Sequence, residues 1–155
     1  VDLPPGTGDV QMTLSQKAQV DGAIIVSTPQ DVALLDARKG IDMFRQLNVP
    51  ILGMIENMST HICSNCGHEE HVFGHGGVAA EAEKLGVPLL AEVPLDLQIR
   101  LASDGGAPIV TSKAKARISP AGSPGIGPLA TIGAITIDNS SDMANRCRTK
   151  TKLSP

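Results

Sequence analysis

Apolar runs alternate with segments of helical spacing from Val1 to about Val110. The runs Ala23–Val26, Pro50–Ile55 and Pro88–Val93 are almost continuously apolar, which is typical of strands that are buried on both faces of a parallel sheet. Residues Val1–Leu3 have the pattern of the end of a further strand. Because strands and helices alternate, the pattern predicts an α/β fold with a doubly wound, mainly parallel sheet whose strands are joined by right-handed crossovers.

Four segments have the spacing of helices. They are Asp9–Gln19, a helix that starts at Thr28 and continues to Leu47, Val78–Leu85, and Asp96–Ala102. In the first of them Val10, Leu14 and Ala18 share one face and should be buried. The second starts with Thr28, which we expect to be the N-cap, and Pro29, which we expect at the first helical position.

The charge balance changes near Val110. Residues 1–110 contain six basic and fourteen acidic side chains, a balance of −8, whereas residues 111–155 contain seven basic and two acidic side chains, a balance of +5. The second part is also rich in Ser, Pro and Gly and loses helical periodicity. We therefore expect a folded domain over 1–110 and a flexible basic tail over 111–155. The alternative is that the apolar run Ile132–Ile137 adds one more edge strand.

The overall composition excludes several classes of protein. The chain has 155 residues, enough for one domain, and its core must be aliphatic because it has two Phe, no Tyr and no Trp. A net charge of −3 argues against a nucleic-acid partner. No run of about 18 apolar residues predicts a membrane span. Three cysteines without a signal peptide indicate a reducing compartment rather than a secreted disulfide framework.

The carboxyl ends of the predicted strands should form the ligand-binding edge of the sheet. Asp2 ends the first strand just before Pro4-Pro5-Gly6. Its carboxylate is a suitable oxygen ligand for Mg²⁺, and the backbone amides around Gly6 are suited to a phosphate. The alternative for this segment is an ordinary Pro- and Gly-containing turn.

The strongest candidate for metal chemistry is the Cys63-x-x-Cys66 pair in the loop after Pro50–Ile55. Three interpretations remain open on the residues alone. The two thiols are suited to an iron–sulfur cluster, or they form a zinc site together with His71 and His75. A thioredoxin-like redox role is weaker, because Gly67 directly after Cys66 favours a loop over the helix start that such thiols need.

An ordered set of motifs gives the chain a family resemblance. The motifs are Asp2-Leu3-Pro4-Pro5-Gly6-Thr7-Gly8-Asp9, Ser27-Thr28-Pro29-Gln30, Gly53-Met54-Ile55-Glu56-Asn57-Met58-Ser59, the Cys63/Cys66 pair, Phe73-Gly74 and Val93-Pro94-Leu95-Asp96. Together they resemble the Mrp/ApbC family of iron–sulfur cluster carrier ATPases, which belongs with MinD to the deviant P-loop NTPases. The resemblance covers Val1 to about Val110 and implies a P-loop NTPase-like fold.

The resemblance implies a nucleotide site that binds ATP and Mg²⁺. Asp2 would be the switch carboxylate near Mg²⁺ and the γ-phosphate, and Gly6 would sense that phosphate. Asn57 would hydrogen-bond the adenine, while Pro94 and its neighbour Asp96 would line the base pocket. The Gly-rich phosphate loop and an upstream switch Asp, which the family carries, are missing from these 155 residues. We therefore expect a truncated family member that hydrolyses ATP poorly.

The resemblance also implies that Cys63 and Cys66 supply half the ligands of a [4Fe–4S] cluster shared across a homodimer. The cluster would be passed to apo iron–sulfur proteins, in the cytoplasm or, in a eukaryote, in the mitochondrial matrix. The alternative function is a non-catalytic, zinc-stabilised α/β binding module. A MinD-like partitioning role is disfavoured, because an amphipathic C-terminal membrane helix is missing and the cysteine pair is present.

Overall fold

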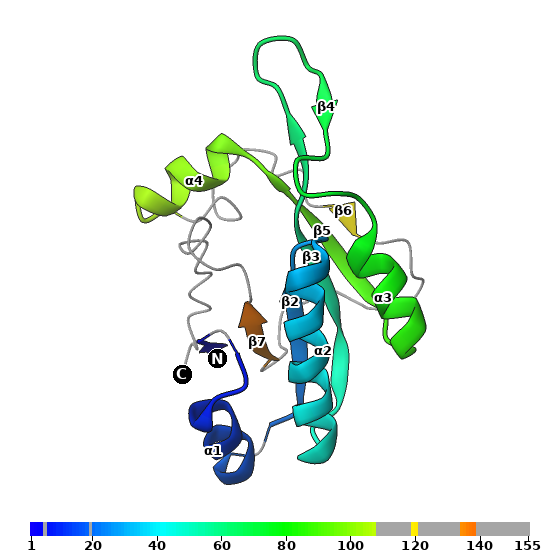
Figure 1. Cartoon of the computed structure of the whole chain (residues 1–155). Helices are drawn as coiled ribbons and strands as arrows, with labels where there is room; N and C mark the ends of the chain where they lie inside the picture. Colours follow the sequence, from blue (N-terminus) through cyan, green and yellow to red (C-terminus); the bar gives the residue numbers. More distant parts are fainter. Residues whose placement is uncertain (5, 19, 108–118, 121–133, 139–155) are drawn as a thin grey trace.

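A computed structural model describes residues 1–4, 6–18 and 20–107, together with the backbone of residues 119–120 and 134–138. Within this part, seven strands form one sheet in the order β1-β7-β2-β3-β5-β6, and β4 pairs with β3 off this path (Figure 1). The strands are β1 (Asp2–Leu3), β2 (Gly22–Ser27), β3 (Ile51–Ile62), β4 (Glu69–Glu70), β5 (Leu89–Leu95), β6 (Ser119–Pro120) and β7 (Ala134–Asp138). Strands β1, β7, β2, β3 and β5 run parallel, whereas β4 and β6 are antiparallel additions. The predicted α/β fold with a mainly parallel sheet is confirmed.

Helices α2 and α3 pack side by side over β2, β3 and β5 (Figure 1). The described helices are α1 (Asp9–Lys17), α2 (Asp31–Gln46), α3 (Gly77–Leu85) and α4 (Leu97–Asp104). None of these four is long and apolar enough to cross a membrane.

The core lies between the sheet and these helices. Phe44 and Ile41 of α2 and Ile25 of β2 are completely buried, as the helical spacing of α2 and the continuous apolar run of β2 predict. The predicted apolar face of α1 is only partly buried: Leu14 packs against the core, whereas Ala18 is exposed. Val10 is 59% exposed, and the buried residue of this helix is Gln11.

Two element boundaries differ from those expected. Helix α2 starts at Asp31 with Gln30 as its N-cap, so Thr28 does not cap it. Pro29 is instead held in the loop, where its carbonyl lies against Gly77 at the start of α3. Strand β3 does not stop at Ile55 but continues to Ile62, because the second half of the strand finds partners in β4 and β5.

The predicted flexible tail contains two segments that join the sheet. β6 pairs with β5 at the edge, whereas β7 lies between β1 and β2 and is parallel to both. For these residues, the tail prediction is wrong, and the alternative strand is an interior strand rather than an edge strand. The physical reason is that these pairings join segments far apart in the chain, which local composition and periodicity do not reveal. The rest of 111–155 lies outside the described residues.

A paired carboxylate joins α2 to α3. The Arg38 guanidinium donates through Nε to Oε1 of Glu81 at 2.5 Å and through Nη2 to Oε2 at 2.6 Å. The side chain of Glu81 is only 4% exposed, while that of Arg38 is 43% exposed. The hydrogen bonds from Arg38 hold the pKa of Glu81 below its ordinary value, although burial alone would raise it. This pair fixes how the two helices sit together.

The Arg38–Glu81 pair should make stability dependent on pH. Because the pKa of Glu81 is lower in the folded chain, its stabilisation is present above the unfolded-state pKa of about 4.3 and is lost as pH falls through the folded pKa. Glu81→Gln should flatten the acid limb of a plot of unfolding free energy against pH. Arg38→Met should lower the unfolding free energy at neutral pH more than the loss of an exposed ion pair does, because it leaves the buried Glu81 carboxylate without its partner.

Urea unfolding between acidic and neutral pH measures both effects. Lys39→Met is the matched control, because the Lys39–Asp36 pair is exposed on the same helix and should contribute less than about 0.5 kcal/mol. An Arg38→Met chain as stable as the Lys39→Met chain would contradict the assignment.

Candidate functional site

The polar strand ends lie along one edge of the sheet. Leu3 is in register with Ile137 of β7, which is in register with Ile25 of β2. The turn that follows Leu3 therefore lies at the same edge as Ser27 and as Glu56, which is the register partner of Ser27. This arrangement is the one expected for the ligand edge of a parallel sheet.

The predicted nucleotide residues fall into two groups along this edge. Asn57 is in register with Val93, so it lies beside the strand segment that continues into Pro94. Asp2 and Gly6 lie on the β1 side, and strands β7 and β2 separate them from β3. The structure thus places Asn57 beside the β5 segment that leads to Pro94, and it separates both from Asp2 and Gly6.

Asn57 lies where the backbone of β3 is irregular. The register to β5 shifts between Asn57 and His61, and Met58 has a φ of 56°, which is uncommon for a residue other than glycine. The Asn57 side-chain Oδ1 accepts a hydrogen bond from the Met58 N–H at 3.0 Å. Irregularities of this kind are common next to functional sites, where they change the direction in which a side chain points. The Nδ2 group of the same amide is a hydrogen-bond donor.

Asp96 has a structural partner. Its Oδ1 accepts a hydrogen bond from the Gln98 N–H at 2.7 Å and caps α4. Asp96 therefore fixes where the chain turns from β5 into α4, directly after Pro94. A role in shaping the predicted base pocket is consistent with this position.

Glu56 is a buried carboxylate whose position sequence reasoning missed. It is completely buried, and its Oε2 accepts a hydrogen bond from the Val78 N–H at 3.0 Å at the start of α3. Its Oε1 has no hydrogen-bond partner among the described residues. A carboxylate at a helix N-terminus is favourable, so Glu56 links the β3 end that carries Asn57 to α3. The continuous apolar pattern before Glu56 gave no signal that its side chain would be buried.

The two cysteines lie on a hairpin that projects beyond the sheet (Figure 1). The end of β3 pairs with β4, with His61 opposite Glu70 and Ile62 opposite Glu69. The turn is closed by the Cys63 N–H, which donates to the His68 carbonyl, and by the Gly67 N–H, which donates to the Cys63 carbonyl, both at 2.9 Å. The predicted loop is thus an ordered turn at the tip of a hairpin.

The turn favours the thiolate form of Cys63. The backbone N–H groups of Cys66 and Asn65 hydrogen-bond to the Cys63 sulfur and hold its pKa below the ordinary value for a thiol. The φ of Gly67 is 72°, a conformation that glycine adopts easily, and it lets the chain reverse directly after Cys66. Cys63 is half-buried and Cys66 is exposed. The pair therefore presents two soft ligands at the surface.

The histidines of this region do not complete a metal site with the cysteines. Among the described residues, which include all four histidines, no group of three or more His, Cys, Asp or Glu side chains is placed to hold a metal ion. His71 instead stacks on His75 with ring centroids 4.3 Å apart, and its Nδ1 lies 3.2 Å from the Ser59 carbonyl oxygen. The arrangement of this single chain disfavours the predicted zinc alternative.

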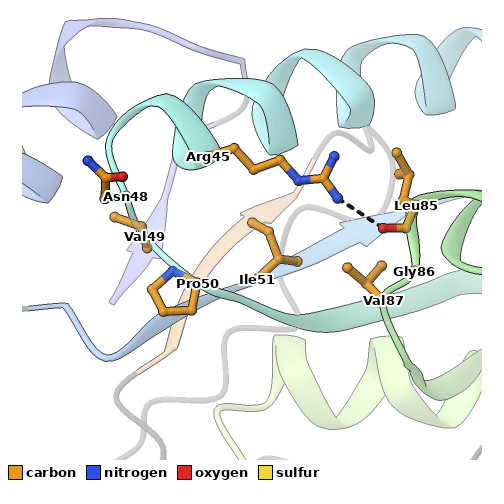
Figure 2. Close-up of a pocket in the computed structure, with 8 residues that line it drawn as sticks. All are labelled: Arg45, Asn48, Val49, Pro50, Ile51, Leu85, Gly86 and Val87. Atoms are coloured by element: carbon orange, nitrogen blue, oxygen red, sulfur yellow. Dashed lines mark hydrogen bonds between the residues drawn. The ribbon is translucent and has the colours of Figure 1, made fainter.

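A hollow of about 370 Å³ lies at the opposite edge of the sheet, near the start of β3. Figure 2 shows Arg45 extending across it, with Nη2 donating to the Leu85 carbonyl at 2.9 Å. Arg45 is the one charged side chain in its lining, which is otherwise mostly apolar. The hollow holds none of the predicted site residues.

Comparison with known proteins points to one family. The family described as "NUBPL iron-transfer P-loop NTPase", of the ParA group, matches residues 1–123, which extends beyond the predicted boundary at Val110. The iron–sulfur cluster carrier protein of Pseudomonas fragi is 59% identical over 108 residues, covering 70% of this chain and 38% of that protein. The iron–sulfur cluster transfer protein NUBPL of Mus musculus is 54% identical over 113 residues, covering 73% of this chain and 35% of that protein. The chain thus spans about a third of the length of these relatives.

A solved structure shares the fold. It is a nucleotide-binding protein of Archaeoglobus fulgidus in complex with ADP, with a TM-score of 0.63 and 38% sequence identity. The match covers 74% of this chain and 46% of that one.

Proposed function

Because the chain belongs to the NUBPL iron-transfer P-loop NTPase family, we propose that it is an iron–sulfur cluster carrier. Cys63 and Cys66 supply two of the four thiolates that hold a [4Fe–4S] cluster. A second copy of the chain supplies the other two, so that the cluster joins a homodimer. The recipients are apo iron–sulfur proteins in a reducing compartment, the cytoplasm or the mitochondrial matrix.

The observation that carries this proposal is the hairpin tip. It presents two thiols, one with a lowered pKa, and the chain's histidines are not placed to complete the set. Thiolates are the ligands that iron–sulfur clusters prefer. Because the tip projects from the sheet (Figure 1), a second tip or an acceptor protein can approach it. Transfer then requires only that acceptor thiolates replace those of the carrier.

We further propose that ATP binds along the carboxyl edge of the sheet. Asn57 donates from Nδ2 to the adenine, and the chain around Pro94 and Asp96 lines the base. Asp2 lies toward the phosphates and the bound Mg²⁺, with Gly6 beside the γ-phosphate. These 155 residues contain no Gly-rich loop with a Lys to cradle the β- and γ-phosphates, so we expect the chain itself to bind ATP weakly and to hydrolyse it very slowly.

Asn57→Ala should weaken the binding of Mg-ATP by about fivefold, because one hydrogen bond to the base is worth about 1 kcal/mol. Calorimetric titration of the purified chain with Mg-ATP measures the change. Asn48→Gly is the control, since Asn48 lies at the opposite edge and its φ of 56° suits glycine. Equal affinities of the Asn57→Ala and Asn48→Gly chains would contradict the role of Asn57.

Anaerobic reconstitution with iron and sulfide tests the carrier function. We expect a brown protein with charge-transfer absorption in the visible range that elutes from a size-exclusion column as a dimer. A colourless monomer that takes up one zinc ion would overturn the proposal and favour the zinc-stabilised binding module.

A further inference from the structure

Gln11 is a buried polar residue that the proposed function does not use. It lies on α1, is 1% exposed and is the buried residue of that helix. Its side-chain Nε2 donates to the Pro4 carbonyl at 2.8 Å and to the Gly6 carbonyl at 3.0 Å. Both protons of the amide are therefore bound to the turn that follows Asp2.

These two hydrogen bonds determine which way the turn faces. No cis peptide bond occurs in the described part of the chain, and in a trans peptide the C=O and the following N–H point in opposite directions. Since the Gly6 carbonyl points toward the buried side chain of Gln11, the Thr7 N–H points away from it. Gly6 itself has a φ of 91°, which glycine adopts without strain.

The remaining atom of the Gln11 amide shows that stability alone does not explain this residue. The Oε1 atom is buried and has no hydrogen-bond partner among the described residues. It lies near Gly8, where an added Cβ would be 3.4 Å away. An unpaired buried acceptor is destabilising, and a methionine of similar length would avoid that cost. The amide is useful because it holds the turn.

We propose that Gln11 is a positioning residue that holds the Pro4 and Gly6 carbonyls on the buried side of the turn and thereby presents the Thr7 N–H to a phosphate group. This inference rests on the proposed nucleotide site. In this arrangement α1 holds the turn in one orientation before phosphate binds. Binding then does not lose free energy to ordering the turn.

The ¹⁵N relaxation of Gly6, Thr7 and Gly8 in the 155-residue chain tests the positioning. Wild-type order parameters should be near the rigid value of about 0.85, and those of Gln11→Met should fall below about 0.6. The thermal midpoint of Gln11→Met should stay within a few degrees of wild type. The control is Gln16→Met, an exposed position on the same helix, which should leave the turn rigid.

Gln11→Glu adds a readout that a merely structural role would not give. A protonated carboxyl donates one hydrogen bond and an ionised one donates none, and burial favours the protonated form. The turn of this variant should therefore be ordered at acidic pH and mobile at higher pH. Wild type and Gln11→Met should show no such transition.

Titration with Mg-ATP tests the link to phosphate. The Thr7 amide signal of wild type should shift in a saturable way, and Gln11→Met should need about ten times more Mg-ATP. Three results would each overturn the proposal: a rigid turn in Gln11→Met, global unfolding of that variant, or a wild-type Thr7 signal that Mg-ATP does not move. Reconstitution of the cluster on the hairpin does not involve this turn, so its outcome judges the carrier function separately.

Discussion

Replacing both Cys63 and Cys66 by alanine should abolish cluster binding and leave a colourless monomer after anaerobic reconstitution. The proposed carrier has two thiolates in each copy, so the double variant loses every ligand that the hairpin offers. The single variant Cys63→Ala should lose most of the visible absorption, because only two thiolates, one Cys66 from each copy, then remain in a dimer that needs four. Visible spectroscopy and size-exclusion chromatography of the same samples measure colour and assembly together.

Cys147→Ala is the matched control for these variants. It removes the third cysteine of the sequence, which lies outside the described residues, and it should leave colour and dimer unchanged. A double Cys63/Cys66 variant that still turns brown and still dimerises would refute the assignment of the hairpin as the cluster site. Unfolding in urea should be similar for all of these chains, because Cys63 is only half-buried and Cys66 is exposed.

Gly77→Ala should destabilise the fold by about 3 kcal/mol, which is at the upper end of the usual cost of overpacking. A Cβ at Gly77 would lie 2.3 Å from the Pro29 carbonyl oxygen and 3.2 Å from the Pro29 Cα. These are backbone atoms and cannot rotate away, so α3 would have to move from the loop that precedes α2. The midpoint and slope of urea unfolding measure the loss of free energy.

Gly105→Ala separates this clash from the general effect of adding a methyl group. The nearest atom to a Cβ at Gly105 is the Leu101 carbonyl oxygen at 3.3 Å, and its φ of −77° suits alanine. This control should change the unfolding free energy by less than about 1 kcal/mol. If both variants were equally stable, the close approach of α3 to Pro29 would not be a constraint on the fold.

The Gly77 contact also has a consequence for the hairpin. α3 follows the cysteine segment directly and is held by Glu56, by Gly77 against Pro29, and by the Arg38–Glu81 pair. A shift of α3 would therefore move the base of the hairpin. We expect Gly77→Ala to reconstitute a cluster with lower yield than Gly105→Ala.

The sequence by itself determined the α/β class and most of the elements. Continuous apolar runs identified β2 and β5, and helical spacing identified α2, in which Leu34, Ala37, Ile41 and Phe44 are buried. These features are local, since each depends on the polarity and spacing of neighbouring residues. The ordered motifs also led to the family that the comparisons support.

The tertiary structure decided what depends on contacts between distant segments. Gln11 is buried because its amide reaches Pro4 and Gly6, so a polar side chain lies inward where the apolar spacing of α1 predicted Val10. Strand β3 extends to Ile62 because β4 and β5 pair with it, and this turns the cysteine loop into a hairpin. β7 lies inside the sheet because it pairs in parallel with both β1 and β2. Backbone pairing between segments far apart in the chain leaves no local pattern in the sequence, whereas burial of an apolar face does.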